Sequence, residues 1–336
     1  LVLNKDKKTL EHKKFYNIID YLKKDDVLVI NRTKVIPARL FGHKENGVIL
    51  ECFLLKRYDL KTWEVLLKPA KKLKIGQRIV FSEGLLEAEL IEIKEDGNRV
   101  LKFEFEGNFE EILDKLGEMP LPPYITEKLT DKNRYQTVYA KQGESVAAPT
   151  AGLHFTVELL EKIKKKGVIL TEVFLDVGLG TFMPIRVEKI EEHRMHQEYF
   201  EIPVKTVAKI QKTAQNGGRV FALGTTVART LEYAHNAIFE KNLNGNSGNR
   251  EDLSKISKSQ NGNLSGEADI FIFPGYEFKT IQGLITNFHA PKSTVLMLAS
   301  AFAGWENLKN AYNHAIQNGE YKFLSYGDSM IIYQNK

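Results

Sequence analysis

The order of apolar and polar positions divides the 336-residue chain into a short opening part, a strand-rich middle and a long part in which strands and helices alternate. In the opening part, apolar residues at helical spacing predict a short amphipathic helix over Phe15–Lys23. The apolar run Asp26–Ile30 follows and predicts a buried strand that ends in Asn31-Arg32-Thr33.

Short β-rich runs follow one another between about Val35 and Phe105, with turn signals between them and no segment of helical length. Strands at this spacing predict a small antiparallel barrel. A helix at Asn108–Gly117 closes this part, and the proline-rich run Met119–Tyr124 ends it. The predicted strands are Val48–Leu55, Trp63–Leu67, Arg78–Phe81, Leu86–Ile93 and Arg99–Phe105.

From about Tyr135 onward, strands and helices alternate, which predicts a mainly parallel sheet covered by helices on both faces. The N-terminal strand has no partner of its own in the opening part, so we place it in this sheet. The predicted helices are Val157–Lys166 with Thr156 as N-cap, Val204–Gln215, Val227–Glu240, Thr294–Ala303 and Asn307–Asn318. The predicted strands are Val168–Val177, Arg219–Leu223, Asp269–Phe273, Ile281–Thr286 and Ser329–Tyr333.

The fold class that follows is α/β: a three-layer α/β/α domain with a mainly parallel sheet, into which a small β-barrel domain is inserted. We assign residues 1–34 and 123–336 to the α/β/α domain and residues 35–122 to the barrel. Residues 241–266 are rich in Asn, Gly and Ser. This composition predicts a flexible surface insertion, to which we assign no function.

At 43% hydrophobic and 27% charged residues, the chain has enough apolar material for a large core, which excludes disorder along most of its length. No run approaches about 18 consecutive apolar residues, so we expect no membrane span. The single cysteine, Cys52, excludes an intramolecular disulfide and a cysteine-rich metal site. The first residues lack the layout of a secretory signal and an initiator Met. We expect a soluble, cytoplasmic monomer that has lost its natural N-terminus.

The net charge of +5 is unevenly distributed. Residues 55–80 carry eight basic side chains against two acidic ones, whereas residues 103–118 carry six acidic side chains against one basic one. A one-sided field of this kind attracts polyanions such as nucleic acid. A lysine-rich face that contacts only solvent is the alternative interpretation.

Several predicted strands of the α/β domain run into loops of small and polar residues. In a parallel sheet the carboxyl ends of the strands share one edge, so these loops should meet in one crevice. Their N–H groups, hydroxyls and helix N-termini suit phosphate or carboxylate, which favours a nucleotide-like ligand. Neither a complete Rossmann fingerprint nor a Walker pattern occurs, which argues against NAD binding and ATP hydrolysis. The loops are Asn31–Thr33, Gly178–Thr181, Gly224–Thr226 and Asn287–Thr294.

Two groups of histidines are candidates for chemistry. His154 ends a stretch of small residues just before a predicted helix. A lone histidine is usually structural, but Gly and Thr neighbours at a helix entrance make it a candidate acid or base. His193 and His196, with glutamates close by, could ligate a metal. No third ligand stands at a motif spacing, so we favour substrate hydrogen bonding or a structural network and predict no metal.

These stretches and several others resemble the QueA family, the S-adenosylmethionine:tRNA ribosyltransferase-isomerases. The matching segments span nearly the whole chain in order, so the resemblance is specific. The chain departs from the family pattern in lacking an N-terminal Arg-Asp…Ser-Arg-Leu element and in having Asp176 where the family usually has His. The matching segments are Asn31–Gly42, Met119–Ile125, Tyr135–Ala140, Val146–Thr156, Val177–Pro184, His193–Glu198, Gly224–Glu232, Phe273–Phe278, Leu284–Ala303 and Tyr321–Ile332.

The resemblance implies an α/β domain with an inserted barrel, in agreement with the pattern above, and an unusual reaction. The ribosyl part of S-adenosylmethionine is transferred and isomerised onto the aminomethyl group of a 7-aminomethyl-7-deazaguanine at the wobble position of tRNA. The product is epoxyqueuosine in tRNA, and adenine and methionine leave. S-adenosylmethionine is then a consumed substrate, no further cofactor is implied, and tRNA is the partner.

Such a reaction needs three kinds of proton transfer. A base must act on the C5′ hydrogens that the sulfonium acidifies, a donor near the purine helps adenine to leave, and an acceptor must keep the incoming amine uncharged. The resemblance offers motif residues for these catalytic roles but does not say which residue does what. The candidates are His154, His289, Asp176 and Asp328.

Candidates for substrate binding come from the same motifs. Arg39 and Arg186 could hold the methionine carboxylate or a tRNA phosphate. Phe155 or Phe288 could stack on a base. The remaining candidates carry hydroxyl, amide or imidazole groups or bring the backbone close to a ligand; they are Thr150, Gly152, Gly180, Thr181, His193, His196, Thr225, Thr226 and Asn287.

Two other classes of protein compete with this interpretation. A non-catalytic RNA-binding protein would use the basic β-barrel for affinity, but it has no need of Gly-, Thr- and His-lined loops around a crevice. An ordinary S-adenosylmethionine methyltransferase predicts a glycine-rich loop after the first strand, where this chain has Asn31-Arg32-Thr33-Lys34. The transferase-isomerase is therefore the favoured hypothesis.

Overall fold

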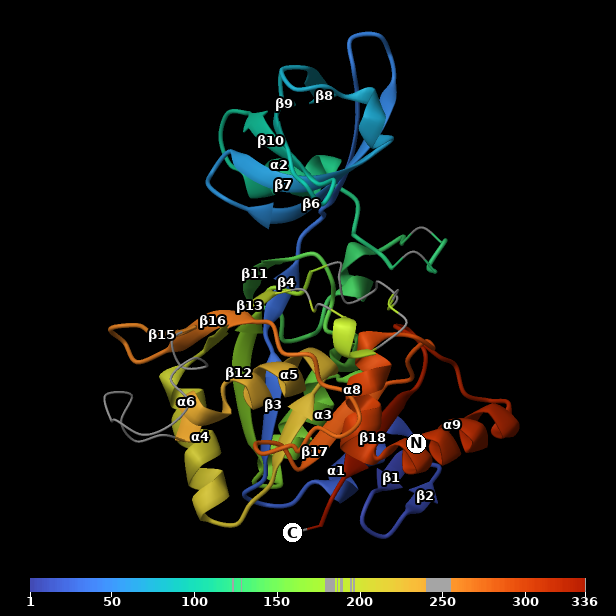
Figure 1. Cartoon of the computed structure of the whole chain (residues 1–336). Helices are drawn as coiled ribbons and strands as arrows, with labels where there is room; N and C mark the ends of the chain where they lie inside the picture. The colour runs from blue at the N-terminus through green and yellow to red at the C-terminus, as the bar shows by residue number, and fades with distance from the viewer. Residues whose placement is uncertain are drawn as a thin grey trace. The chain divides into compact units, whose positions relative to one another are not determined.

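Two compact units make up the described part of the chain in the computed structural model (Figure 1). One comprises residues 1–33, 136–142 and 149–336 and contains a large sheet with its helices. The other comprises residues 34–135 and 143–148 and contains a barrel. The structure describes residues 1–122, 124–127, 129–178, 185, 187, 190–193, 195, 197–239 and 255–335.

The barrel is closed by six antiparallel strands, as the strand-rich pattern predicted. Leu50, Cys52 and Leu54 lie two residues apart and are completely buried, so this strand turns one side to the barrel interior. The predicted closing helix is also present, with Asn108 as its N-cap. The barrel order is β10 (Arg99–Glu104), β7 (Thr62–Lys68), β6 (Ile49–Arg57), β5 (Arg39–His43), β8 (Arg78–Ser82) and β9 (Leu86–Ile93).

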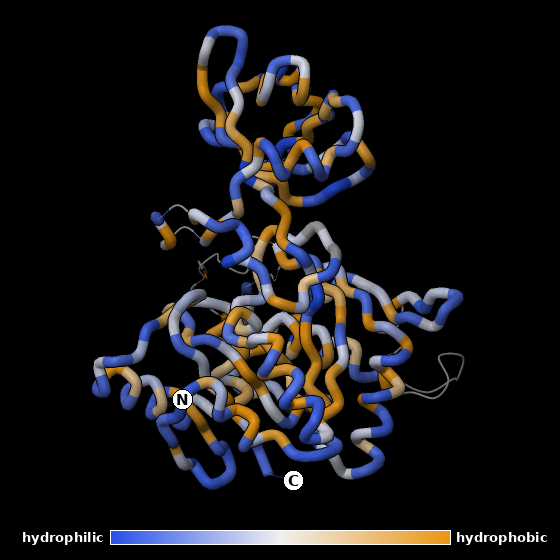
Figure 2. Tube along the Cα trace, turned by 180° about the vertical axis from the view of Figure 1, so that it is seen from behind, coloured by the Kyte–Doolittle hydropathy of each residue, from blue (hydrophilic) through white to orange (hydrophobic). Residues whose placement is uncertain are grey.

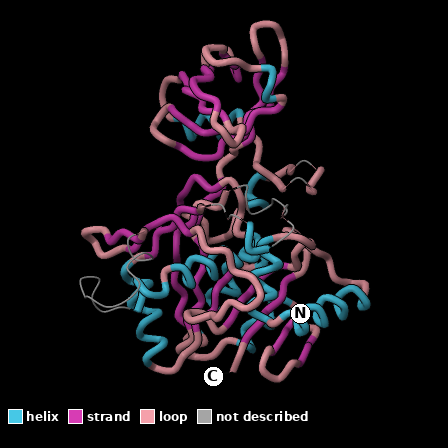
Figure 3. Tube along the Cα trace, in the orientation of Figure 1, coloured by secondary structure: helices cyan, strands magenta, loops and turns pink. Residues whose placement is uncertain are grey.

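Ten strands of the first unit form one sheet (Figures 1 and 3). They lie in the spatial order β15 (Ile256–Lys258), β16 (Leu264–Ala268), β13 (Glu198–Ile202), β12 (Ile169–Leu175), β3 (Val27–Asn31), β14 (Val220–Leu223), β17 (Gly283–Asn287), β18 (Ser329–Tyr333), β1 (Val2–Asn4) and β2 (Thr9–Glu11). A separate pair is formed by β4 (Thr33–Val35) and β11 (Gln142–Ser145).

The large sheet is mixed, so the prediction of a mainly parallel sheet is correct only for its centre. Neighbouring strands in the run β12-β3-β14-β17 are parallel, and β1 is parallel to β18. In contrast, β13 is antiparallel to β12 and β16, and β18 is antiparallel to β17. The outer strands are short and pair as hairpins or with the chain ends, which an alternation of strands and helices does not reveal.

Five of the seven predicted helices lie where the periodic segments were predicted, with small shifts at their ends. No helix among the described residues is long and apolar enough to cross a lipid bilayer. The helices used below are η1 (Phe15–Asn17), α1 (Ile18–Tyr21), α2 (Phe109–Leu116), η4 (Thr150–His154), α3 (Val157–Lys165), α4 (Val204–Gln215), α5 (Thr225–Tyr233), α6 (His235–Phe239), α8 (Thr294–Ala303) and α9 (Trp305–Asn318).

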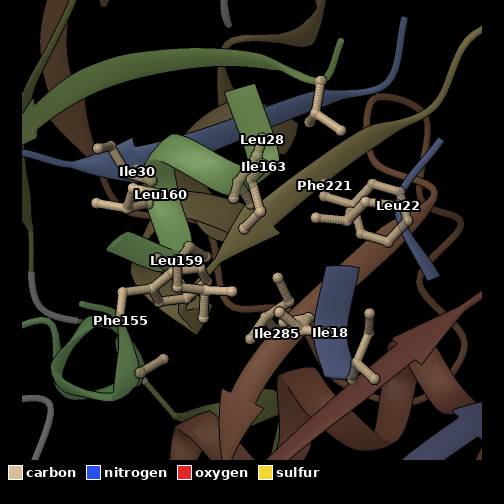
Figure 4. Close-up of a cluster of buried hydrophobic side chains, with 14 of the residues drawn as sticks. Ile18, Leu22, Leu28, Ile30, Phe155, Leu159, Leu160, Ile163, Phe221 and Ile285 are labelled. Carbon is tan, nitrogen blue, oxygen red and sulfur yellow. The ribbon is translucent and has the colours of Figure 1, made fainter. Parts of the chain in front are cut away.

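One face of the sheet is covered by α3 and α1. Leu28 of β3 and Ile285 of β17 belong to the same buried cluster as Leu160 and Ile163 of α3 and Ile18 of α1 (Figure 4). The side of α3 that points to the sheet is apolar because these residues recur at helical spacing. Figure 2 shows the apolar residues concentrated along the strands of this unit.

The other face is covered by α4, which completes the three predicted layers. Thr171 of β12 shares a 2.8 Å hydrogen bond with Thr206 of α4. The neighbouring residue, Leu170, packs against the α3 cluster instead. Since adjacent residues of a strand point to opposite faces, α3 and α4 lie on opposite sides of the sheet.

Several predicted elements differ from the observed ones. The helix predicted over Phe15–Lys23 is a short 3-10 turn followed by the single-turn helix α1, and the helix predicted over Val227–Glu240 is divided into α5 and α6 at Ala234. The strand predicted at Asp269–Phe273 does not form. Ile272 in this segment is buried although the segment pairs with no strand. The apolar run therefore indicated burial correctly but not the strand.

The segment predicted as a flexible insertion, residues 241–266, is not irregular throughout. Residues 241–254 lie outside the described residues, but β15 and β16 form an antiparallel hairpin that extends the sheet. Gly262, with φ +81°, lies in its turn, and Leu264 is almost completely buried. Some of the Asn, Gly and Ser residues of this segment form the turn between two strands. Composition alone does not distinguish such a turn from a flexible segment.

Candidate functional site

Three of the predicted loops begin at one edge of the large sheet. The parallel strands β3, β14 and β17 pair in register, with Ala222 opposite Val29 and Leu223 opposite Ile285. Their carboxyl ends therefore coincide, and the loops after them start side by side. The carboxyl end of β12 lies at the same edge, since Val173 pairs with Asn31. The loops thus start together as the topology of a parallel sheet requires, but the candidate residues line two separate cavities and not the single crevice that the sequence predicted.

Two of the four predicted catalytic residues, His154 and Asp328, line a cavity of about 320 Å³. The His154 ring stacks on Phe15, with ring centroids 4.9 Å apart and an interplanar angle of 26°. On the same cavity wall, Nδ1 of His12 lies 2.8 Å from the hydroxyl of Tyr321. The sequence indicated neither His12 nor Tyr321 as a site residue: His12 stands in no matching segment, and Tyr321 was passed over although it begins the segment that contains Asp328.

The predicted binding residue Asn287 fixes the tautomer of His154. The Asn287 side-chain amide donates to the carbonyl oxygens of Leu324 and Ser325, at 2.9 and 3.1 Å. Its oxygen, Oδ1, is therefore the atom that lies 3.3 Å from Nε2 of His154. Because this oxygen can only accept, Nε2 carries the proton and Nδ1 keeps its lone pair.

Burial lowers the pKa of His154, and its contact with Asn287 and the nearby Asp328 carboxylate only partly offset this effect. The imidazole is therefore neutral at pH 7. Asp328 is itself held in place, since its carboxylate accepts a 2.8 Å hydrogen bond from the backbone N–H of Lys322. A neutral histidine with a fixed tautomer, near a carboxylate in a cavity, has the properties of a proton acceptor.

His289, the third predicted catalytic residue, is fixed by its neighbours in a different way. Its Nε2 lies 2.7 Å from the hydroxyl of Thr286, and its backbone N–H donates to the hydroxyl of Tyr312. Burial lowers the pKa of His289 to about 4, so the ring is neutral. His289 does not line the cavity that contains His154.

A second, smaller cavity of about 20 Å³ is lined by Thr225 and Thr226, both predicted as binding residues. These two residues begin α5, directly after Gly224, whose φ of +93° favours glycine. The same cavity is lined by Arg229 and Glu198, which form a buried ion pair. The sequence did not indicate Arg229, although it lies within one of the matching motifs.

The other described candidates have contacts that do not mark them as ligand-binding residues. Phe288 is completely buried among Tyr312, Tyr321 and Phe323. A Cβ atom on Gly152 would lie 2.0 Å from the Tyr139 hydroxyl, so this glycine is explained by packing. Thr150 begins the short helix that ends at His154.

Asp176, the fourth predicted catalytic residue, follows the end of β12, and its backbone N–H donates to Tyr199. His193 contacts the ring of Phe271, which lines the smaller cavity. In the barrel unit, Nε of Arg39 donates to Glu51 at 2.8 Å. The predicted residues Gly180, Thr181, Arg186 and His196 lie outside the described residues.

Within the described ranges, no group of three or more His, Cys, Asp or Glu side chains has the arrangement of a metal site. The candidate residues instead offer N–H groups, hydroxyls, carboxylates and imidazoles. These groups suit an organic substrate that carries polar and charged groups.

Comparison with known proteins identifies the family. The chain matches the family model described as queuosine biosynthesis protein over residues 1–332. It is 54% identical to the S-adenosylmethionine:tRNA ribosyltransferase-isomerase of Fusobacterium nucleatum, over 99% of this chain and 89% of that protein. It is 50% identical to the protein of the same name from Desulfitobacterium hafniense, over 99% of this chain and 92% of that protein.

A solved structure agrees with this assignment. The crystal structure of S-adenosylmethionine tRNA ribosyltransferase from Thermotoga maritima is 34% identical in sequence, with a TM-score of 0.51, over 98% of this chain and 90% of that one. The similarity thus covers both the sheet unit and the barrel unit. The chain belongs to the family of queuosine biosynthesis proteins.

Proposed function

We propose that this chain is an S-adenosylmethionine:tRNA ribosyltransferase-isomerase. It transfers and isomerises the ribosyl part of S-adenosylmethionine onto 7-aminomethyl-7-deazaguanine at the wobble position of tRNA, giving epoxyqueuosine, adenine and methionine. The observation that carries the proposal is the family match over residues 1–332, with named enzymes at 54% and 50% identity. S-adenosylmethionine is consumed, and the proposal includes no further cofactor.

Within this reaction we assign His154 the role of a proton acceptor. Three properties support the assignment: its ring is neutral, its Nε2 proton is held by Asn287, and it lines the 320 Å³ cavity. The lone pair on Nδ1 can then accept a proton from the substrate. The Asp328 carboxylate in the same cavity stabilises the imidazolium that forms.

Mass spectrometry of tRNA tests the reaction itself. tRNA that carries 7-aminomethyl-7-deazaguanine is incubated with the protein and S-adenosylmethionine, and the anticodon nucleoside is then analysed. The proposal predicts the mass of the added ribosyl-derived group, with adenine and methionine released in equal amounts. An added methyl mass would instead identify a methyltransferase, and an unchanged mass would identify an RNA-binding protein without this activity.

The role of His154 is tested by His154→Gln in single-turnover assays. The glutamine keeps a donor for Asn287 but cannot accept a proton at neutral pH, so we expect the rate to fall about a hundredfold or more. His235→Gln is the matched control, because His235 is also partly buried with a lowered pKa but contacts Thr280, outside both cavities. A wild-type rate in His154→Gln removes this residue from the mechanism.

We also propose that the protein acts as a monomer in the cytoplasm, where its tRNA substrate occurs. The large exposed hydrophobic side chains of the described residues are contributed by separate elements, such as Tyr16, Ile49 and Ile316, which supports a monomer. Light scattering after size-exclusion chromatography should give the mass of one chain, 38.3 kDa. A mass of twice this value contradicts the proposal.

A further inference from the structure

Arg229 has buried hydrogen-bond donors for which the described residues provide no acceptor. Its side chain is 5% exposed, and its Nη2 donates to the Glu198 carboxylate. The other two guanidinium nitrogens, Nε and Nη1, are buried and have no hydrogen-bond acceptor among the described residues. A buried N–H group without an acceptor is unfavourable, so these donors require an explanation.

Both donors belong to a side chain that lines the small cavity at the carboxyl edge of the sheet. The hydroxyl of Thr294, which lines the same cavity from the first residue of α8, is also buried without a partner among the described residues. Unused polar groups from two helices therefore surround one space of about 20 Å³. A water-sized group needs about 10–15 Å³, so the space suits a small polar group rather than a whole ligand.

The electrostatic setting favours an acceptor with negative charge. The cavity lies at the N-terminal end of α5, where Gly224 provides no side chain to cap the first N–H groups. It also lies at the N-terminal end of α8. Both helix dipoles place partial positive charge there. The charge of Glu198 is balanced by Arg229 itself, so the helix ends determine the preference.

The remaining wall of the cavity is apolar. It is formed by side chains that carry no charge and have no hydrogen-bond donor. The group that fits this space is a carboxylate, and the apolar lining suits the aliphatic carbons that carry it. The apolar lining consists of Met195, Ile270, Phe271, Ile272, Val295 and Leu298.

We infer that Arg229 and Thr294 bind the methionine carboxylate of S-adenosylmethionine. This inference rests on the proposed function, which supplies the substrate. The carboxylate is the only anionic group of that substrate, and it accepts hydrogen bonds without donating any, so it can satisfy the unused donors. Arg39, an earlier candidate for this role, already donates from Nε to Glu51.

The test compares two ligands that differ in this group. The dissociation constants of S-adenosylmethionine and of decarboxylated S-adenosylmethionine are measured calorimetrically for the full chain and for Arg229→Lys. Lysine keeps the positive charge opposite Glu198 but lacks the additional guanidinium donors. We expect Arg229→Lys to weaken S-adenosylmethionine binding about ten- to a hundredfold and to change binding of the decarboxylated compound less than about twofold.

Arg219→Lys is the matched control. Arg219 is equally buried in an ion pair, with Asp26, but its Nε and Nη2 both donate to acceptors within the protein. It lies at the opposite end of β14 from α5. The affinities of Arg219→Lys for both ligands should equal those of the wild type.

A parallel assay of tRNA modification by the wild type separates this inference from the proposed function. If the wild type modifies tRNA but Arg229→Lys loses affinity for both ligands equally, or for neither, the carboxylate site is wrong and the enzyme assignment stands. Equal wild-type affinity for the two ligands also overturns the site.

If thermal melting shows that Arg229→Lys does not fold, Thr294→Val provides the test in its place. It removes the unused hydroxyl and keeps the shape of the side chain. A roughly fivefold loss of affinity for S-adenosylmethionine alone supports the site. Unchanged affinity for S-adenosylmethionine contradicts it.

Discussion

The two ends of the central strands each bury an arginine paired with a carboxylate, and the two pairs differ in how the protein uses them. At the amino end, the side chains of Arg219 and Asp26 are 4% and 3% exposed. At the carboxyl end, those of Arg229 and Glu198 are both 5% exposed. The residue types and the burial are thus almost the same.

The difference lies in the hydrogen bonds. Asp26 accepts from two nitrogens of the Arg219 side chain and from the backbone N–H groups of Lys23 and Arg219, and Arg219 also donates to Tyr21. Arg229 makes one such bond and leaves two buried nitrogens without an acceptor in the described chain. An ion pair whose hydrogen-bond donors all have acceptors stabilises the fold. An ion pair that leaves buried donors without acceptors, at the loop edge of a parallel sheet, can bind an acceptor group of a ligand.

The largest expected effect concerns the satisfied pair. Arg219→Met leaves the Asp26 carboxylate buried without its partner, so we expect the free energy of unfolding to fall by about 3–5 kcal/mol. Arg229→Met should lower it by about half as much, because the wild type already carries buried donors without acceptors. Urea denaturation of both variants at pH 7 measures the two values. Equal losses would show that the two pairs do not differ in the way described.

The second largest expected effect is a dependence of stability on pH, caused by His289 at the carboxyl end of the central strands. The pKa of His289 is lowered by burial from 6.5 to about 4, so the unfolded chain binds the proton more readily than the folded one. The contribution of His289 to stability is therefore complete above pH 6.5 and is lost as the pH drops towards 4, by at most about 3 kcal/mol for a pKa shift of this size.

Urea denaturation of the wild type and of His289→Gln at pH 7 and pH 4.5 measures this dependence. Glutamine can keep a hydrogen bond to Thr286 but does not titrate, so the variant should lose less stability between the two pH values. Identical losses in both proteins exclude His289 as the source.

The smallest effect distinguishes used from unused hydroxyls. Thr294→Val removes a buried hydroxyl without a partner in the described structure, so stability should stay unchanged or rise by up to about 1 kcal/mol. Thr206→Val is the matched control, because its hydroxyl donates to the carbonyl of Glu172 at 2.7 Å, and it should cost about 1 kcal/mol. Thermal denaturation followed by circular dichroism compares the two; a clear loss for Thr294→Val contradicts this account.

Much of the fold could be predicted from local patterns. The ranges of α4, α8, β9 and β18 were predicted to the residue, because strong periodicity and clear turn signals determine them. The N-cap role of Thr156 is confirmed by the hydrogen bond from Leu159. In contrast, β13 and β16 were missed, since short strands at a sheet edge depend on pairing that no local pattern records.

The candidate site was less accessible to sequence reasoning. His154 and Asn287 were predicted as site residues from the motifs. Their contact, however, joins residues 133 positions apart and is a property of the fold. Arg229 stood in a motif and was still missed. Whether its donors are used depends on Glu198 and on the packing of α5 against α8, which the sequence does not show.

Nuclear magnetic resonance of the arginine side chains tests the central claim most directly. In a ¹⁵N-labelled protein, the Nε–H signals of Arg229 and Arg219 are assigned from the lysine variants and followed as S-adenosylmethionine is added. We predict that the Arg229 signal shifts with S-adenosylmethionine but not with its decarboxylated form, and that the Arg219 signal stays in place. An Arg229 signal that stays in place while S-adenosylmethionine binds would contradict the assignment of this end of the sheet to ligand binding.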